Sequence, residues 1–172
     1  MPKSNRQKPK TLFTAVVVSI DPRRVYLKDP NEVEFKAIKV TIPGPNGQEY
    51  AWYQCMVNGG WEEWPIGAYE LAKAVEDLGA GEILLNCIDC DVQGAGFDIN
   101  LMKFISDAVT IPVIASSGAG TVAHVSEFFM ETNASTSLAL QAFSIGRRCL
   151  FTNGQASKVI NILQENCDCE TT

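Results

Sequence analysis

Two carboxylates of this sequence lie beyond apolar runs, where an enzyme would need a general acid or base. Asp21 directly follows the run Ala-Val-Val-Val-Ser-Ile, and Asp91 follows the apolar run at 82–88. When parallel strands alternate with helices, groups past the carboxyl ends of the strands face one rim, where substrates bind. A carboxylate there can take up or release a proton. The competing interpretation of Asp21 is an ion pair with Arg23 or Arg24.

A glycine-rich segment has the composition of a phosphate-binding turn. Residues 116–120 read Ser-Ser-Gly-Ala-Gly and follow a third apolar run at 111–115. Glycine lets the backbone approach an anion closely, and free N–H groups at the start of a helix favour phosphate. An ordinary turn of the same composition is the alternative. His124, the only histidine, falls within the following helix and is expected to be structural.

The elements that must position these residues alternate between strand and helix. Asp98 can cap one of the helices. Such alternation predicts a parallel sheet, and four units make half of the eight that close a (β/α)₈ barrel. The fold class is therefore α/β, as a half-barrel. Strands are predicted at about 12–20, 82–88, 111–115 and 137–143, and helices at about 66–78, 98–108, 121–131 and 154–165.

A long connection at 22–65 separates the first strand from the first helix. Its apolar runs at 34–41 and 49–55 flank Pro-Gly-Pro-Asn-Gly, and Asn-Gly between two such runs predicts a β-hairpin. We expect Trp61 and Trp64 to pack this insertion against the domain. The first helix is expected to bury Ala68, Leu71, Val75 and Leu78.

Composition restricts the class of protein. The chain has 172 residues and a net charge of −6, which argues against general nucleic-acid binding because phosphate contacts require a basic surface. No apolar run is long enough to cross a membrane. Residues 1–11 carry four basic side chains and no acid, and we expect a disordered tail there, followed by one domain at 12–172. The tail is too short for an organelle-targeting peptide and lacks its Ser-rich pattern.

Six cysteines raise the question of a metal or redox site. Cys87 and Cys90 have the spacing of a redox motif. Because Cys87 is expected inside a strand, and residues three apart on a strand point to opposite faces, the two thiols are not expected to meet one metal ion. We therefore predict free thiols, no metal site and no cofactor.

Three segments together resemble one enzyme family. Residues 16–25, 79–91 and 111–120 are similar, in the same order, to the carboxyl-terminal half of the cyclase barrel of imidazole glycerol phosphate synthase. The hairpin insertion resembles the plant form, in which one polypeptide carries glutaminase and cyclase. The resemblance covers residues 15–143.

The resemblance implies a lyase of histidine biosynthesis. This family forms imidazole glycerol phosphate and an aminoimidazole carboxamide ribotide from a phosphoribulosyl precursor and ammonia, which a glutaminase domain or subunit supplies. By resemblance Asp21 is one of two catalytic aspartates, and Asp91, Ser117 and Gly118 line the phosphate side. Plant relatives imply a plastid location; a cytoplasmic location is the alternative.

Departures from the family pattern lead us to expect little or no cyclase activity from this chain alone. The first four strand–helix units, with the partner aspartate, and the glutaminase are missing. Val92 stands where the family has glycine, Leu140 and Gln141 replace small residues, and Ser144 replaces histidine. The alternatives are a non-catalytic phosphate-binding half-barrel that forms a homodimer, a remnant of a related phosphosugar isomerase barrel, or a fragment whose missing half lies upstream.

Overall fold

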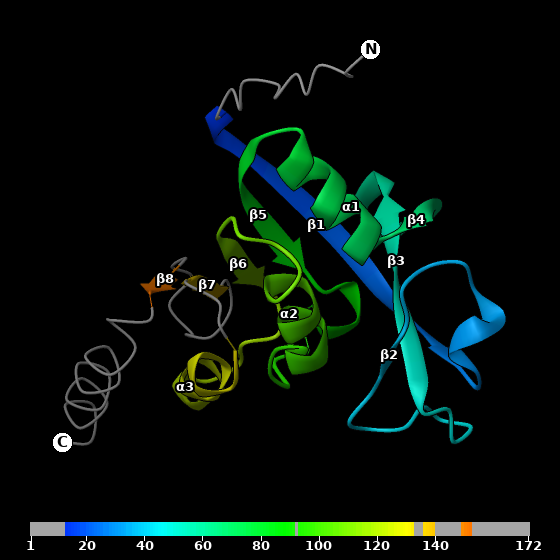
Figure 1. The fold of residues 1–172 in the computed structure, drawn as a ribbon. Coiled ribbons are helices and arrows are strands. Elements are labelled where there is room, and N and C mark those ends of the chain that lie inside the picture. Colours follow the sequence, from blue (N-terminus) through cyan, green and yellow to red (C-terminus); the bar gives the residue numbers. More distant parts are fainter. Residues whose placement is uncertain (1–12, 92, 133–135, 140–148, 153–172) are drawn as a thin grey trace, which may run out of the picture.

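A sheet of eight strands organises the chain in the computed structural model, which describes residues 13–91, 93–132, 136–139 and 149–152 (Figure 1). The strand order is β2-β3-β1-β5-β6-β7-β8, and β4 pairs with β3. The strands are β1 (Phe13–Leu27), β2 (Ile38–Lys39), β3 (Tyr50–Val57), β4 (Glu62–Gly67), β5 (Ala80–Asn86), β6 (Val113–Ser116), β7 (Thr136–Ala139) and β8 (Cys149–Thr152).

Helices follow the strands as the sequence predicts. The Asp98 carboxylate accepts the Leu101 N–H and starts one helix, and the Thr121 hydroxyl accepts the His124 N–H and starts another. Gly79, with φ of 94°, ends the first helix. The α-helices are α1 (Ala68–Asp77), α2 (Ile99–Ser106) and α3 (Val122–Glu131), and the short 3-10 helices are η1 (Pro30–Glu32), η2 (Asn58–Gly60) and η3 (Ile88–Cys90).

β1 changes its partner halfway along its length. Up to Ile20 it pairs in parallel with β5, and from Asp21 to Leu27 it pairs antiparallel with β3. The expected strand end at residue 20 is therefore wrong, and Asp21 lies inside a strand. The backbone stays extended because β3 supplies hydrogen-bond partners where β5 no longer does.

The insertion contains the predicted hairpin but packs through a different tryptophan. β2 pairs antiparallel with β3, which confirms the hairpin. Trp61 and Trp64 are 91% and 50% exposed, so the expectation that they pack against the domain is wrong. Trp52 is buried instead, and its ring stacks on Phe35 with centroids 4.8 Å apart. Trp61 lies between η2 and β4, and Trp64 lies in β4, which pairs only with β3 among the described strands.

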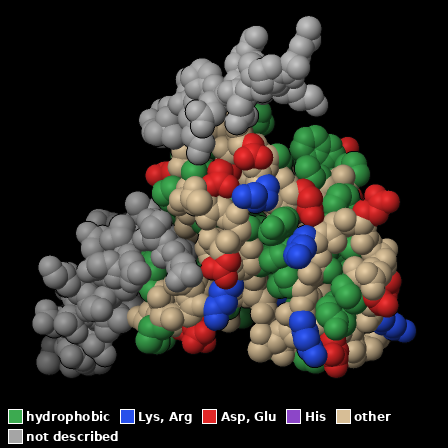
Figure 2. All heavy atoms as spheres, in the orientation of Figure 1, with side chains coloured by type: hydrophobic (Ala, Val, Ile, Leu, Met, Phe, Trp, Pro, Cys, Tyr) green, Lys and Arg blue, Asp and Glu red, His purple; other side chains and the backbone are tan. Residues whose placement is uncertain are grey.

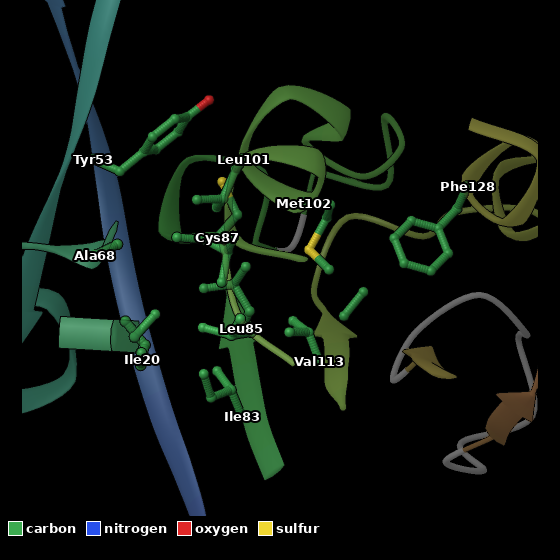
Figure 3. Close-up of a cluster of buried hydrophobic side chains, with 14 of the residues drawn as sticks. Ile20, Tyr53, Ala68, Ile83, Leu85, Cys87, Leu101, Met102, Val113 and Phe128 are labelled. Atoms are coloured by element: carbon green, nitrogen blue, oxygen red, sulfur yellow. The ribbon is translucent and has the colours of Figure 1, made fainter. Parts of the chain in front are cut away.

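The core lies between the sheet and the three helices. Figure 3 shows Ile83 and Leu85 along β5, followed by Cys87 just after its end, between Ile20 and Val113. Each fully buried aliphatic side chain of this kind stabilises the fold by roughly 1.5–3 kcal/mol. Helical residues that complete this core are Ala68, Ala72, Val75, Leu101, Met102, Ile105, Val125 and Phe128.

One residue of the expected helical stripe points the other way. Leu78 is 77% exposed, so its predicted burial is wrong, and Ala72 is buried in α1 together with Ala68 and Val75. Leu78 follows the last residue of α1, where the chain already turns toward Gly79, and the helical spacing no longer applies there.

β1, β5, β6 and β7 form the parallel part of the sheet, which confirms the half-barrel. β8 was not expected and pairs antiparallel with β7. The predicted tail at 1–11 and the predicted helix at 154–165 lie outside the described residues, as do Val92, Leu140, Gln141 and Ser144.

None of the described helices combines the length and the apolar character needed to cross a membrane. Acidic and basic side chains are interspersed on the face shown in Figure 2, with no basic patch on that face.

Candidate functional site

Asp21 lies in a row of polar side chains near the carboxyl ends of the parallel strands. Ile20 pairs with Leu85, and Asn86 pairs with Ser116, so Asp21, Asn86 and Ser116 occupy the next row across the sheet. Adjacent strands are about 4.8 Å apart, which sets Asp21 roughly 10 Å from Ser116. These side chains project from the face opposite the one that Ile20 and Leu85 present to the helices.

Asn86 is a further candidate site residue, which was not predicted. It is half-buried, and the alternation of Glu82, Leu84 and Asn86 with buried Ile83 and Leu85 was the signal available in the sequence. It is the final residue of β5. An amide there can donate to, or accept from, a ligand that reaches the Asp21 carboxylate.

The two arginines that follow Asp21 bind other groups. Arg24 forms an ion pair with Asp98, and Arg23 donates from Nη2 to the Gly60 carbonyl oxygen at 3.1 Å. Among the described residues no ion pair joins either arginine to Asp21, so the ion-pair interpretation of Asp21 is wrong. The Asp21 carboxylate, half-buried, accepts from the Ser19 hydroxyl at 3.4 Å.

A buried polar cluster fixes this part of β1 against the start of α2. Asp98 is 5% exposed and accepts from Arg24 through Nε at 3.1 Å and through Nη2. The Tyr53 hydroxyl donates to its two carboxylate oxygens at 3.1 and 3.3 Å. The Leu101 N–H donates at 3.1 Å, and the Cys87 thiol approaches to 3.9 Å. The cluster thus joins β1, β3, α2 and the residue that follows β5.

The electrostatics of the cluster keep both partners of Asp98 protonated. Burial, followed by the nearby Asp98 charge, raises the pKa of Tyr53 well above its ordinary value. Burial works to lower the pKa of Arg24, but the Asp98 charge and its hydrogen bonds outweigh it and raise that pKa. Tyr53 therefore remains a neutral donor and Arg24 a cation near neutral pH.

The segment after β5 reaches Asp91 through a turn. β5 ends at Asn86, and η3 follows before Asp91, whose N–H donates to the Ile88 carbonyl oxygen at 3.2 Å. Asp91 is exposed. Asp89 anchors the turn, because its carboxylate accepts the Arg24 N–H at 2.6 Å. Asp91 is therefore held near β1 through a neighbouring residue rather than by its own side chain.

The turn after β6 packs directly on the loop after β5. Gly118 has φ of 98°, and its carbonyl oxygen accepts the Gly96 N–H at 2.8 Å. A Cβ at Gly118 would overlap the Gly96 carbonyl, so only glycine fits there. Ser117 has φ of 67°, and its hydroxyl donates to the Cys87 carbonyl oxygen at 2.8 Å. This hydroxyl joins two strand ends, which leaves the backbone to contact a ligand.

Backbone donors gather where this turn meets α3. No described residue accepts a hydrogen bond from the amide of Gly118 or Ala119. His124 Nδ1 accepts the Gly120 N–H at 3.2 Å, so the histidine has the structural role expected of it. Free amides at the amino end of a ten-residue helix attract an anion such as phosphate.

The cysteine pair near Asp91 differs from the sequence-based expectation. Cys55, Cys87 and Cys90 are free thiols, as predicted. Cys87 lies just after β5 and Cys90 ends η3, so the expected placement on opposite faces of a strand is wrong. No three His, Cys, Asp or Glu side chains cluster in metal-binding geometry within the described residues.

Comparisons with known proteins agree with the resemblance. A family model described as histidine biosynthesis protein matches residues 10–147. The chain is 72% identical over 129 residues to the chloroplastic imidazole glycerol phosphate synthase hisHF of Arabidopsis thaliana, covering 75% of this chain and 22% of that protein. It is 49% identical over 129 residues to imidazole glycerol phosphate synthase hisHF of Schizosaccharomyces pombe, covering 75% and 24%.

A shorter relative is also similar. Over 129 residues the chain is 43% identical to the imidazole glycerol phosphate synthase subunit HisF of Methanobrevibacter smithii, covering 75% of this chain and 45% of that subunit. The chain thus spans less than half the length of each of these relatives. On the matched family model and these identities, the chain belongs to the histidine biosynthesis protein family.

Proposed function

We propose that the chain supplies the second half of the cyclase barrel of imidazole glycerol phosphate synthase, a lyase that makes imidazole glycerol phosphate and an aminoimidazole carboxamide ribotide. The observation that carries this proposal is that Asp21 and the Ser117–Gly118 turn lie near the carboxyl ends of parallel strands of one sheet, in a chain that is 72% identical over 129 residues to the plant synthase. The identities favour the cyclase over a related phosphosugar isomerase.

In this proposal Asp21 is the general acid or base of ring closure. It projects from the sheet face opposite the helices, and no arginine neutralises it among the described residues. The substrate phosphate binds at the amides of Gly118 and Ala119 and the start of α3, with Asp91 at the adjoining turn. The row that contains Asp21, Asn86 and Ser116 is adjacent to the proposed phosphate site, because Ser116 ends β6 and directly precedes the glycine turn.

The proposed partners follow from what one half-barrel lacks. Ring closure requires a second carboxylate, and a chain with one of two proton-transfer groups loses most of its transition-state stabilisation. A glutaminase domain or subunit would supply ammonia. The proposed location is the plastid, on the strength of the chloroplastic relative.

A second candidate function is a phosphate-binding homodimer without cyclase activity. Before Asp21, β1 has no described neighbour on the side opposite β5, and Val16 and Val17 are 45% and 51% exposed. An open edge and exposed apolar side chains favour association. Two copies would together provide eight parallel barrel strands.

Thermal unfolding with imidazole glycerol phosphate tests the phosphate site. At a hundredfold excess over Kd a ligand stabilises by about 2.7 kcal/mol, which raises Tm by roughly 5–10 °C. Gly118→Ala should abolish the shift. Gly47→Ala is the matched control, because Gly47 also has positive φ, of 74°, but a Cβ there would meet no other atom within 4 Å. A Tm that does not respond in the unmodified chain would contradict the phosphate site.

Complementation tests the catalytic role. The chain mixed with the preceding half-barrel of the Arabidopsis relative should gain ammonia-dependent synthesis, and Asp21→Asn should lower kcat by about 10²–10⁴-fold. Turnover by the chain alone at the rate of the mixture would contradict its dependence on the preceding half-barrel.

A further inference from the structure

Cys87 and Cys90 occupy the two ends of the turn that carries the chain from β5 to Asp91. The Cys90 N–H donates to the Cys87 carbonyl oxygen at 3.2 Å, and the Asp91 N–H continues the turn by donating to Ile88. The two thiols are also linked electrostatically, because the neighbouring Cys87 thiol lowers the pKa of Cys90. Neither thiol has a part in the proposed cyclase chemistry.

The turn brings the two cysteines within reach of a covalent bond. A hydrogen bond from residue i+3 to residue i holds the first and last Cα atoms of a turn within about 7 Å. Disulfides span Cα separations of about 4.4–6.8 Å. Closing the bond therefore requires rotation of the side chains and little movement of the backbone.

The two thiols differ in access and in acidity. Cys87 is 4% exposed and contacts Asp98, whereas Cys90 is half-buried. The neighbouring Cys87 thiol lowers the pKa of Cys90. Burial and the charges of Asp98 and Asp89 oppose this effect, and Arg24 supports it. Cys90 is consequently the thiol that reacts first with an oxidant, and Cys87 is the thiol that then attacks the mixed disulfide on Cys90.

We propose that Cys87 and Cys90 are a redox-active dithiol that closes to an intramolecular disulfide beside the candidate site. The Cys90 thiolate attacks one sulfur of a small disulfide such as oxidised glutathione and releases one glutathione thiol. Cys87 then gives up its proton and attacks the Cys90 sulfur, which forms the protein disulfide and releases the second glutathione. The protein loses two hydrogens, and glutathione disulfide is reduced to two thiols.

The disulfide would affect the candidate site in two ways. A disulfide removes the thiol proton that Cys87 directs at Asp98, and it clamps the turn that leads directly into the Asp91 backbone. Formation of the bond depends only on the turn, so this inference goes beyond the proposed function and does not require it.

Equilibration in glutathione buffers tests the proposal on the full chain. After an acid quench and alkylation, trypsin releases residues 74–103 as one peptide that contains Cys87 and Cys90 and no other cysteine. As the share of oxidised glutathione rises, this peptide should convert to an unalkylated form lighter by two hydrogens, and dithiothreitol should reverse the change. A peptide that stays doubly alkylated, or that stops at a stable glutathione adduct, would overturn the proposal.

Three variants make the result specific. Cys55→Ser is the matched control, because Cys55 is buried in β3, burial raises its pKa to about 12, and its loss should leave closure unchanged. Cys90→Ser should abolish closure and leave Cys87 at least about tenfold less reactive toward iodoacetamide than Cys90 is in the unmodified chain. Cys87→Ser should trap the glutathione adduct on Cys90. A Cys87→Ser chain whose Cys90 stays free of glutathione, or a Cys90→Ser chain whose Cys87 reacts with iodoacetamide as fast as Cys90 does in the unmodified chain, would overturn the assignment.

Discussion

At the residue scale, Asp98 connects more of the molecule than any other described carboxylate. It caps α2 through the Leu101 N–H and accepts from Arg24 of β1 and Tyr53 of β3. Its side chain is 1% exposed, and that of Arg24 is 18% exposed. A buried carboxylate with donors on several sides keeps its charge stabilised, and each donor loses its partner if the charge is removed.

Asp98→Asn should therefore destabilise the chain by about 2–4 kcal/mol in chemical unfolding, because asparagine can still cap α2 but leaves the Arg24 charge unpaired. Glu49→Gln is the control. Glu49 pairs with Lys39 on the surface, with side chains 58% and 67% exposed, so its loss should change the unfolding free energy by less than about 0.5 kcal/mol. Equal effects of the two substitutions would contradict the role given to Asp98.

The sequence predicted some of these residues and missed others for identifiable reasons. Asp98 was found as a helix cap because its role depends on the next three residues. Its ion pair with Arg24 was missed because the partner lies 74 positions away. Trp61 and Trp64 were misjudged because large aromatic side chains are usually buried, a tendency that says nothing about which tryptophan of an insertion faces the domain.

At the element scale, the last turn of α1 holds the connection between α2 and β6. Glu76 accepts from the Thr110 N–H at 2.6 Å and from its hydroxyl at 2.7 Å. Lys73 donates to the Ala108 carbonyl oxygen at 3.0 Å and pairs with Glu76 at 3.2 Å. These contacts set the point at which the chain enters β6, and β6 ends in the glycine turn of the candidate site.

Acid should weaken this clamp. Burial works to raise the pKa of Glu76, but the hydrogen bonds from Thr110 and the Lys73 contact outweigh it and lower that pKa to about 2. The stabilisation is present above the ordinary carboxyl pKa of about 4.3 and is lost as pH falls toward 2. Unfolding free energies between pH 6 and pH 2.5 should fall by about 1–2 kcal/mol more in the unmodified chain than in Glu76→Gln.

Glu131→Gln serves as the control for this measurement. Glu131 pairs with Lys103, but its side chain is 55% exposed, so this variant should follow the pH dependence of the unmodified chain. If Glu76→Gln and the unmodified chain lost stability in parallel, the clamp would not be the source of the acid sensitivity.

Elements with local signals were predicted more reliably than elements defined by distant partners. α2 begins where the predicted Asp98 cap places it, because a capping side chain acts within three residues, and α3 begins close to its predicted start, where Thr121 is the cap. The end of β1 was misplaced because β3 extends it, and β8 was missed because its partner is β7 rather than anything in its own sequence. β5 ends at Asn86, before the predicted end at residue 88, because η3 takes the chain out of the sheet.

At the scale of the whole molecule, the open edge of β1 is the feature that association must cover. Val17 pairs in register with Glu82 and projects from the face opposite the helix-covered core. If two copies pack against each other through this face, the mass in solution is near twice 18.8 kDa. Light scattering after size-exclusion chromatography measures that mass directly.

Val17→Lys should shift the mass to that of one chain, because a charge would be buried in the shared face. Leu78→Lys is the control, since Leu78 is 77% exposed at the end of α1 and belongs to the outer surface. A Val17→Lys chain that keeps the double mass would contradict association through this face.

The half-barrel itself could be predicted because four strand–helix alternations are a property of the whole sequence and tolerate errors at single boundaries. The candidate site could be predicted only in outline. Asp21 and the glycine turn lie at one edge, as parallel strands require, but the approach of Gly118 to Gly96 depends on two loops separated in sequence by α2.

The two partners of β1 become available at different times in the life of each chain. β3 lies within the insertion and leaves the ribosome soon after β1, whereas β5 follows only after β4 and α1. The antiparallel half of the pairing can therefore form on a nascent chain while the parallel partner is still being synthesised. The hairpin insertion would then hold β1 extended during translation, with its amino-terminal half ready to receive β5.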